Sequence, residues 1–178
     1  LNSEHVLGVL DQPFDHLHVS GYSLLDGQTR VVGVAALDKT RALSRTTSVD
    51  VCSVAPLRDI TPGVFMAAAD DVTCLFANEE EAQVLGGTDS TDEAVMMLAT
   101  RFNEVVVTRG VSGAVARKDG VTFRATSSSD AVVDTTGAGD AATGAYLAVR
   151  LGDGSIGEGL EAAMAAAAVV VRGLGSRG

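Results

Sequence analysis

Residues 134–150 read DTTGAGDAATGAYLAVR, and two glycines, Gly137 and Gly139, stand directly before a helical pattern. Because glycine has no side chain, such a loop leaves backbone N–H groups uncovered, and the start of a helix adds partial positive charge. The stretch therefore predicts an anion-binding loop at Gly137, Ala138 and Gly139. Asp140 stands beside this loop, where its carboxylate can either cap the helix or accept a proton from a ligand hydroxyl. The loop alone leaves both interpretations of Asp140 open.

Outward from this loop, short apolar runs alternate with helical patterns. Strands are predicted at 16–22, 48–54, 71–78 and 104–110, and helices at 27–44, 79–86, 90–102, 138–151 and 156–172. Residues 55–69 combine turns at two prolines with an apolar helical end, and Asp119-Gly120 predicts a hairpin over 112–126. Repeated strand–helix units with apolar strands favour an α/β fold, a three-layer α/β/α sandwich around a mostly parallel sheet. Ligands of such sheets bind beyond the carboxyl ends of the strands.

The composition argues against several classes of partner. The chain has 178 residues, of which 46% are hydrophobic, and 23 acidic against 13 basic residues give a formal net charge of −10. An acidic surface repels phosphate backbones and anionic lipids, so neither nucleic acid nor a membrane is an expected partner. No signal peptide or membrane-spanning run is present in the sequence, and a cytoplasmic setting is expected.

The two cysteines give no sign of a metal centre or a disulfide. Cys52 and Cys74 lie in the apolar runs SVDVCSV and DVTCLFA, without the CxxC spacing of a zinc site. The histidines have no clustered carboxylates. We therefore expect both cysteines to be buried thiols within strands.

An anion-binding loop with a carboxylate at its rim suits phosphoryl transfer to an alcohol, because amides stabilise the phosphoryl charge while the carboxylate orients the hydroxyl. The stretch DTTGAGD at 134–140, 78-NEEEAQVLGG-87 and 105-VVVTRGVSGAVARKDG-120 occur in an order that resembles the ribokinase-like (PfkB) carbohydrate kinase family. This resemblance implies a ribokinase-like fold and an ATP-dependent, Mg²⁺-dependent kinase that phosphorylates a sugar hydroxyl. A nucleoside kinase of the same family is the alternative.

The resemblance also implies roles for single residues. Asp140 matches the catalytic base, and Gly137, Ala138 and Gly139 match the anion hole around the transferred phosphate. Read without the resemblance, the glycines form a tight turn and Asp140 caps the helix.

Further positions match the family's nucleotide and cation sites. Asn78 and Glu81 match an Asn-x-x-Glu pair near the nucleotide phosphates, with Glu81 acting on Mg²⁺ through water. Read alone, this segment also fits a helix start rich in acids. The positions that match the border of the nucleotide are Thr108, Gly110 and Gly113. The positions that match a monovalent cation site, for K⁺ in some members, are Asp134 and Thr136.

The family also has an N-terminal part with early strands, a small β lid and most residues that grip the sugar, and residues 1–178 contain no counterpart. The chain begins with Leu1 instead of Met. We therefore expect residues 1–178 to form a partial PfkB-type kinase domain, the nucleotide-binding and catalytic half, which is inactive alone. An uncovered sheet edge then favours association, as in a homodimer. A non-catalytic nucleotide-binding or structural fragment is the alternative.

Overall fold

The computed structural model describes residues 3–127 and 136–172. Its six strands follow one another in chain order within one sheet. They are β1 (His16–Ser20), β2 (Thr46–Asp50), β3 (Cys74–Asn78), β4 (Glu104–Thr108), β5 (Ala114–Lys118) and β6 (Val121–Ala125). The first three pair in parallel, and β5 pairs antiparallel with β6. The structure thus confirms the predicted α/β fold with a mostly parallel sheet.

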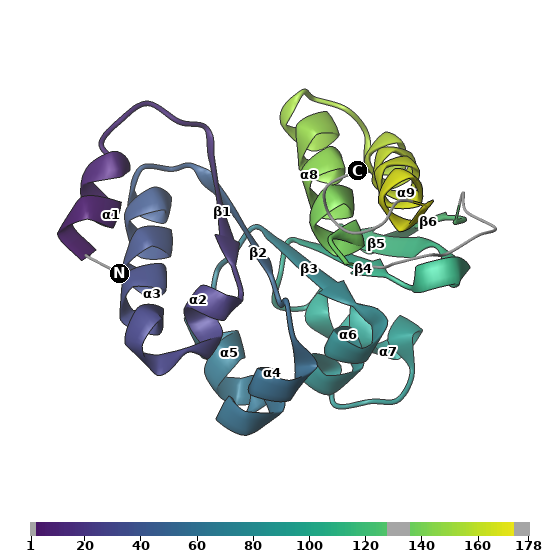
Figure 1. Cartoon of the computed structure of the whole chain (residues 1–178), viewed down its shortest axis with the longest axis horizontal. Helices are drawn as coiled ribbons and strands as arrows, with labels where there is room; N and C mark the ends of the chain where they lie inside the picture. Colours follow the sequence, from purple (N-terminus) through teal and green to yellow (C-terminus); the bar gives the residue numbers. More distant parts are fainter. Residues whose placement is uncertain (1–2, 128–135, 173–178) are drawn as a thin grey trace. The chain divides into compact units, whose positions relative to one another are not determined.

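The chain divides into two compact units, residues 1–105 and 106–178. Helices of the first unit are α1 (Ser3–Val9), α2 (Tyr22–Leu25), α3 (Gly27–Ala42), α4 (Val54–Ile60), α5 (Pro62–Ala68), α6 (Glu79–Gly86) and α7 (Thr91–Leu98) (Figure 1). The second unit holds the short 3₁₀ helix η1 (Gly110–Ser112), α8 (Ala138–Leu151) and α9 (Ile156–Arg172). None of the described helices is long and apolar enough to cross a membrane.

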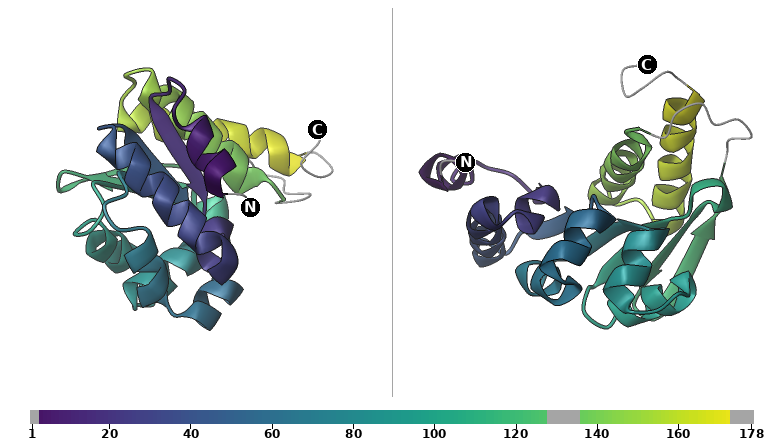
Figure 2. Two further views of the ribbon diagram at one scale, coloured as in Figure 1. Left: turned by 90° about the vertical axis from the view of Figure 1, so that its left-hand side faces the viewer. Right: turned by 60° about the horizontal axis from the view of Figure 1, so that its bottom comes forward.

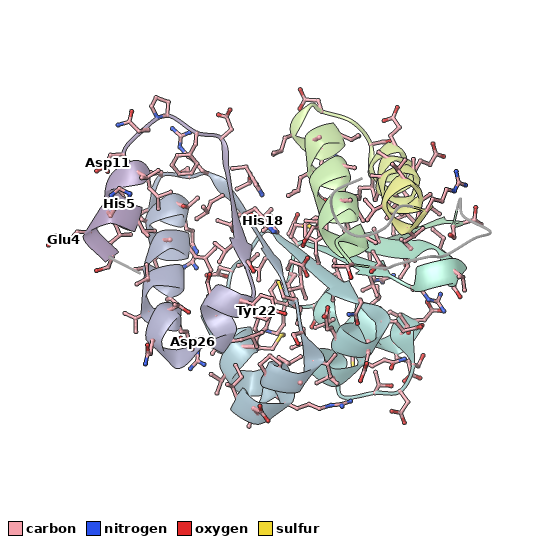
Figure 3. The ribbon with its side chains drawn as sticks, viewed as in Figure 1. Glu4, His5, Asp11, His18, Tyr22 and Asp26 are labelled. Carbon is pink, nitrogen blue, oxygen red and sulfur yellow. The ribbon has the colours of Figure 1, made fainter. Side chains whose placement is uncertain are left out.

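In the first unit, most residues of β2 and β3 are buried, and α3 lies between the strands and α1 (Figures 1 and 2). Val49 and Leu75, in the middle of β2 and β3, have no exposed surface. Asp26 starts α3, because its Oδ1 accepts hydrogen bonds from the backbone N–H groups of Gln28 (2.8 Å) and Thr29 (3.0 Å) (Figure 3). Because β1, β2 and β3 pair in parallel, their carboxyl ends lie at the same edge of the sheet.

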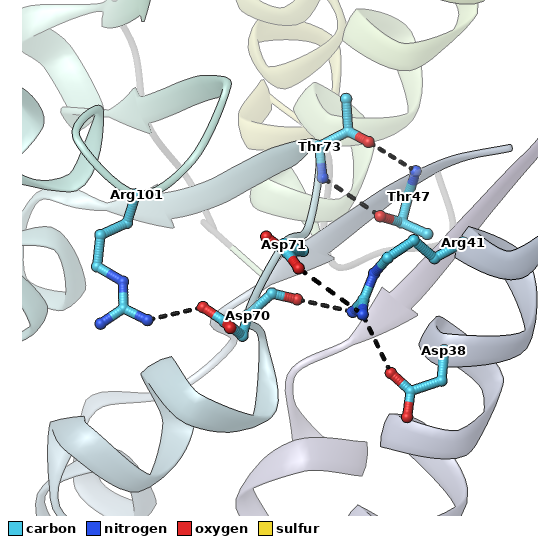
Figure 4. Close-up of polar contacts among 7 residues, drawn as sticks. All are labelled: Asp38, Arg41, Thr47, Asp70, Asp71, Thr73 and Arg101. Atoms are coloured by element: carbon cyan, nitrogen blue, oxygen red, sulfur yellow. Dashed lines mark hydrogen bonds and ion pairs between the residues drawn. The ribbon is translucent and has the colours of Figure 1, made fainter. Parts of the chain in front are cut away.

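Polar contacts connect the loops at the opposite, amino edge of these strands (Figure 4). Thr47 and Thr73 exchange two hydrogen bonds of 3.2 Å, each from a backbone N–H to the other hydroxyl. Arg41, near the end of α3, donates to the carbonyl oxygen of Asp70 (3.0 Å) and lies 3.8 Å from the Asp71 carboxylate. Exposed ion pairs contribute little stability singly, so this network serves mainly to fix where β2 and β3 begin.

In the second unit, α8 and α9 pack side by side, and α9 also contacts β5 and β6 (Figure 2). Tyr146 of α8 is fully buried, and a Cβ atom at Gly159 of α9 would lie 3.0 Å from its ring. The predicted hairpin is confirmed, because Asp119 and Gly120 join β5 to β6 with φ of 50° and 78°. Such a pair of positive φ angles is what a two-residue hairpin turn requires.

Two local predictions were wrong. Helix occupies both halves of 55–69, because Pro56 lies in the first turn of α4 and Pro62 opens α5, where a missing N–H costs nothing. The predicted strand 48–54 ends at Asp50, and Cys52 is half-buried with φ of 71°. A cysteine in this left-handed conformation turns the chain out of the sheet. Cys74 is buried within β3, as expected.

Candidate functional site

The first part of the candidate site is the junction of β3 and α6 in the first unit. Asn78 is the N-cap of α6, and its Oδ1 accepts a hydrogen bond from the backbone N–H of Glu81 (2.9 Å). In return, Glu81 Oε2 accepts from the backbone N–H of Asn78 (2.8 Å). This reciprocal capping box satisfies two N–H groups that have no partner within the helix. The predicted pair, Asn78 and Glu81, is therefore joined by two hydrogen bonds at the carboxyl end of β3.

Glu81 is an unusual carboxylate, because only 3% of its surface is exposed. Its pKa is raised from 4.5 to about 7, mainly by burial and in addition by the carboxylates of Asp50 and Glu80. The hydrogen bond from the Asn78 backbone opposes this shift. Asp50 ends β2, and no role was predicted for it from the sequence. An acidic residue at the end of a strand next to β3 was the signal that could have identified it.

The raised pKa of Glu81 makes stability depend on pH. Between its unfolded value of 4.5 and its folded value of about 7, the folded protein binds more protons than the unfolded chain. The stability contributed by this group is therefore present below pH 4.5 and is lost as the pH rises through 7. In urea unfolding without divalent cations, we expect Glu81→Gln to lose less stability than the parent between pH 5 and pH 8. Equal pH dependence of the two proteins would contradict the assignment.

The same carboxylates fit a magnesium ion. Within residues 3–127 and 136–172, no group of three or more His, Cys, Asp and Glu side chains forms a metal cage. Mg²⁺ does not need one, because it keeps several waters and uses one or two carboxylates together with substrate phosphates. Glu81 supplies hard oxygen ligands, and its repulsion from Asp50 is relieved by a divalent cation. These two residues would hold Mg²⁺ or its waters.

The second part of the candidate site lies in the second unit, where β4 ends. Thr108 is the half-buried last residue of β4, and Gly110 and Gly113 have φ of 53° and 88°. A Cβ atom on Gly113 would lie 2.0 Å from the carbonyl oxygen of Ala125, so packing against the end of β6 requires glycine there. Around Gly110, in contrast, such an atom would meet nothing within 4 Å. Open space at Gly110 lets a ligand approach the backbone of this turn.

The third part is the start of α8, also in the second unit. Gly137 is the N-cap with φ of 80°, and among the described residues no side chain caps this helix. The carbonyl oxygen of Gly137 accepts from the backbone N–H of Ala141 (2.9 Å). At Gly139, a Cβ atom would meet nothing within 4 Å, so packing does not explain this glycine. The N–H groups of the first turn, which includes Ala138, have no partners within the helix and suit an anion.

Asp140 lies exposed in the first turn of α8. Because Gly137 occupies the N-cap, the interpretation of Asp140 as the helix cap is wrong. The carboxylate thus stands beside the uncapped N–H groups while open to solvent. Thr136 is an exposed turn residue just before the helix. Asp134, its predicted partner at a monovalent cation site, lies outside the described residues.

The predicted residues therefore form three local clusters. Asn78 and Glu81 come together in the first unit. Thr108, Gly110 and Gly113 come together at the end of β4, and residues 136–140 form the start of α8; both belong to the second unit. Each cluster occupies the end of an element, with backbone geometry that suits binding.

The chain is similar in sequence and in fold to known proteins. A sequence model of the pfkB family of carbohydrate kinases matches residues 9–178. The structure is similar to that of an E. coli protein assigned as ribokinase II, in complex with ATP and Mg²⁺, with 25% identity and a TM-score of 0.86. It is also similar to a Vibrio cholerae fructokinase with bound fructose, ADP and calcium (25% identity, TM-score 0.83). Adenosine kinase of Sinorhizobium meliloti shares the fold, at 24% identity and a TM-score of 0.87.

The matches extend over nearly the whole chain but only part of each relative. They cover 98%, 99% and 100% of this chain for the E. coli, Vibrio and Sinorhizobium proteins, respectively. The corresponding shares of those proteins are 58%, 60% and 54%. The chain thus spans little more than half the length of these relatives.

Proposed function

Because the chain belongs to the pfkB family of carbohydrate kinases, we propose that it carries the catalytic machinery that transfers the γ-phosphoryl group of ATP to a sugar hydroxyl. The observation that carries this proposal is the start of α8. There, an uncapped helix N-terminus with open space at Gly139 adjoins the exposed carboxylate of Asp140. An anion site and a proton acceptor thus occupy the same helical turn, which is the combination that phosphoryl transfer to an alcohol needs.

Each group at this turn has a distinct task. The backbone N–H groups of Ala138 and Gly139 donate to the oxygens of the transferred phosphoryl group and stabilise its charge. Asp140 orients the acceptor hydroxyl and takes its proton as the oxygen attacks the phosphorus. The transition state of phosphoryl transfer is loose, so the proton can leave late, and the carboxylate acts mainly by positioning the hydroxyl.

The other two clusters bind the nucleotide and its cation. The turn at Thr108, Gly110 and Gly113 borders ATP. Glu81, held by Asn78, orients the waters of Mg²⁺, which neutralises phosphate charge when bound. Thr136 and Asp134 contribute to a site for a monovalent cation such as K⁺. Support for these cofactors comes from the E. coli relative with ATP and Mg²⁺ and from a Vibrio fructokinase variant with fructose, ADP and potassium.

A nucleoside acceptor is the second candidate. Two proteins with this fold are an adenosine kinase and a Salmonella enterica aminoimidazole riboside kinase. Their acceptors carry a ribose, whereas the Vibrio relative binds fructose. A panel of free sugars and nucleosides therefore distinguishes the two candidates by which class gains a phosphate.

Calorimetric titration with ATP tests the binding half of the proposal. With Mg²⁺ present, we expect saturable binding of ATP, and removal of Mg²⁺ with a chelator should weaken it. The variant Gly139→Val places a branched side chain beside the N–H groups that face the phosphate and should weaken binding further. A useful control is Gly144→Ala, which lies later in α8 in open space and should bind ATP as the parent does. Absence of binding at millimolar ATP would contradict the proposal.

A further inference from the structure

The start of α6 contains three consecutive acids, Glu79, Glu80 and Glu81, and each contacts a different group. Glu81 accepts from the Asn78 backbone within the capping box. Glu80 forms an exposed ion pair with Arg58 of α4 (3.2 Å). Glu79 accepts a short hydrogen bond of 2.6 Å from the hydroxyl of Thr91, the first residue of α7. The Glu79–Thr91 bond is the contact that ties the first turn of α6 to the neighbouring helix.

Thr91 is built into the structure, with 5% of its surface exposed. Its hydroxyl accepts a hydrogen bond from Gln83 Nε2 (3.2 Å), which also donates to the carbonyl oxygen of Asp89 (3.0 Å). Because the Thr91 oxygen accepts a hydrogen bond from Gln83, the hydroxyl donates its own hydrogen to Glu79. At the C-terminal end of α6, a Cβ atom on Gly86 would lie 2.9 Å from Ala94 of α7, so the helices are in close contact there as well.

The capping box needs such an anchor. Its two hydrogen bonds, of 2.8 and 2.9 Å, both join Asn78 to Glu81 and so tie the box to no other element. The first turn of a helix is also where helices fray. Glu79 adjoins Asn78 in the chain, so fixing its side chain restrains the N-cap and the turn that follows.

We infer that Thr91 is a positioning residue, which acts through Glu79 to hold the capping box of Asn78 and Glu81 ready for the Mg²⁺–nucleotide complex. This inference rests on the proposed function. It assigns to α7, which bears none of the proposed site residues, a specific part in cation-dependent nucleotide binding. Loss of the Thr91 hydroxyl should therefore reduce the gain in ATP affinity that Mg²⁺ provides.

The test compares Thr91→Val, which keeps the shape and removes the hydroxyl, with the parent protein. The dissociation constant of ATP is measured without and with Mg²⁺. The value without Mg²⁺ divided by the value with Mg²⁺ reports the coupling between the two ligands. We expect Thr91→Val to lower this ratio about fivefold, as the loss of a hydrogen bond to a charged group allows. Thr91→Ser should restore the ratio, and Glu79→Gln should lower it in part.

Thr88→Val is the matched control. Thr88 donates a hydrogen bond of similar length, 2.7 Å, to Glu93 in the same corner between α6 and α7. We expect this variant to keep the Mg²⁺ ratio of the parent. Hydrogen exchange without nucleotide adds a second readout: amides at 79–81 should exchange faster in Thr91→Val than in Thr88→Val.

Three results would overturn the inference while leaving the proposed function intact. One is an unchanged Mg²⁺ ratio in Thr91→Val, and another is an equal fall in Thr88→Val, which would show a general structural effect. If Thr91→Val fails to fold, an unchanged ratio in Glu79→Gln would reject it. A parent protein that binds no ATP would instead reject the proposed function itself, and the inference with it.

Discussion

Replacement of Asp140 by Asn is expected to lower the rate of phosphoryl transfer by about 10²- to 10⁴-fold, the usual contribution of a positioned general base. Asparagine keeps the size of the side chain but cannot accept the proton of the attacking hydroxyl. Asp140 is exposed, so the fold should not change. Affinity for ATP should stay nearly constant or rise slightly, because a negative charge is removed beside the phosphate site. Steady-state kinetics with calorimetric titration measures both quantities.

Glu161→Gln provides the control for this variant. Glu161 is an exposed acid on α9, so its substitution removes the same charge from the same unit. We expect normal turnover from Glu161→Gln. Near-normal turnover from Asp140→Asn, or an equal loss from both variants, would reject Asp140 as the base.

The largest effect on stability is expected from Gly113→Ala. The added Cβ atom would lie 2.0 Å from the backbone oxygen of Ala125, and the φ of 88° is itself unfavourable for alanine. Since β6 is paired with β5, the clash cannot be relieved without breaking the end of the hairpin. We expect a loss of at least about 3 kcal/mol in the free energy of unfolding, or failure to fold. Denaturant unfolding followed by circular dichroism measures this loss.

Gly120→Ala separates the clash from the conformational cost. Gly120 has a φ of 78° in the turn of the same hairpin, but a Cβ atom there meets nothing within 4 Å. Its loss should be about 1–2 kcal/mol, the cost of a left-handed alanine alone. Equal losses from the two variants would show that the contact with Ala125 does not matter.

Much of this protein could be predicted from sequence because its signals are local. The Asp119-Gly120 turn, the glycines before α8 and the acid-rich start of α6 each depend on a few neighbouring residues. The role of Pro56 and Pro62 was misjudged because a proline ends a helix or begins one, and the sequence pattern does not distinguish these cases.

Long-range contacts could not be predicted in this way. The proximity of Asp50 to Glu81 arises only when β2 pairs with β3. Similarly, the bond between Thr91 and Glu79 depends on how α7 packs against α6. The first contact raises the pKa of Glu81, and the second restrains its position. Neither Asp50 nor Thr91 belongs to a recognisable motif.

The central claim is that this chain supports transfer of phosphate from ATP to a hydroxyl, and it departs from the expectation drawn from the sequence that residues 1–178 are inactive alone. Phosphorus NMR of the protein with ATP, Mg²⁺ and the panel of sugars and nucleosides tests it most directly. The proposal predicts that ADP and one phosphomonoester form together, in equal amounts, only with Mg²⁺ and an acceptor present, and not with Asp140→Asn. ATP binding without a phosphomonoester from any acceptor, or ADP and inorganic phosphate alone, would contradict it.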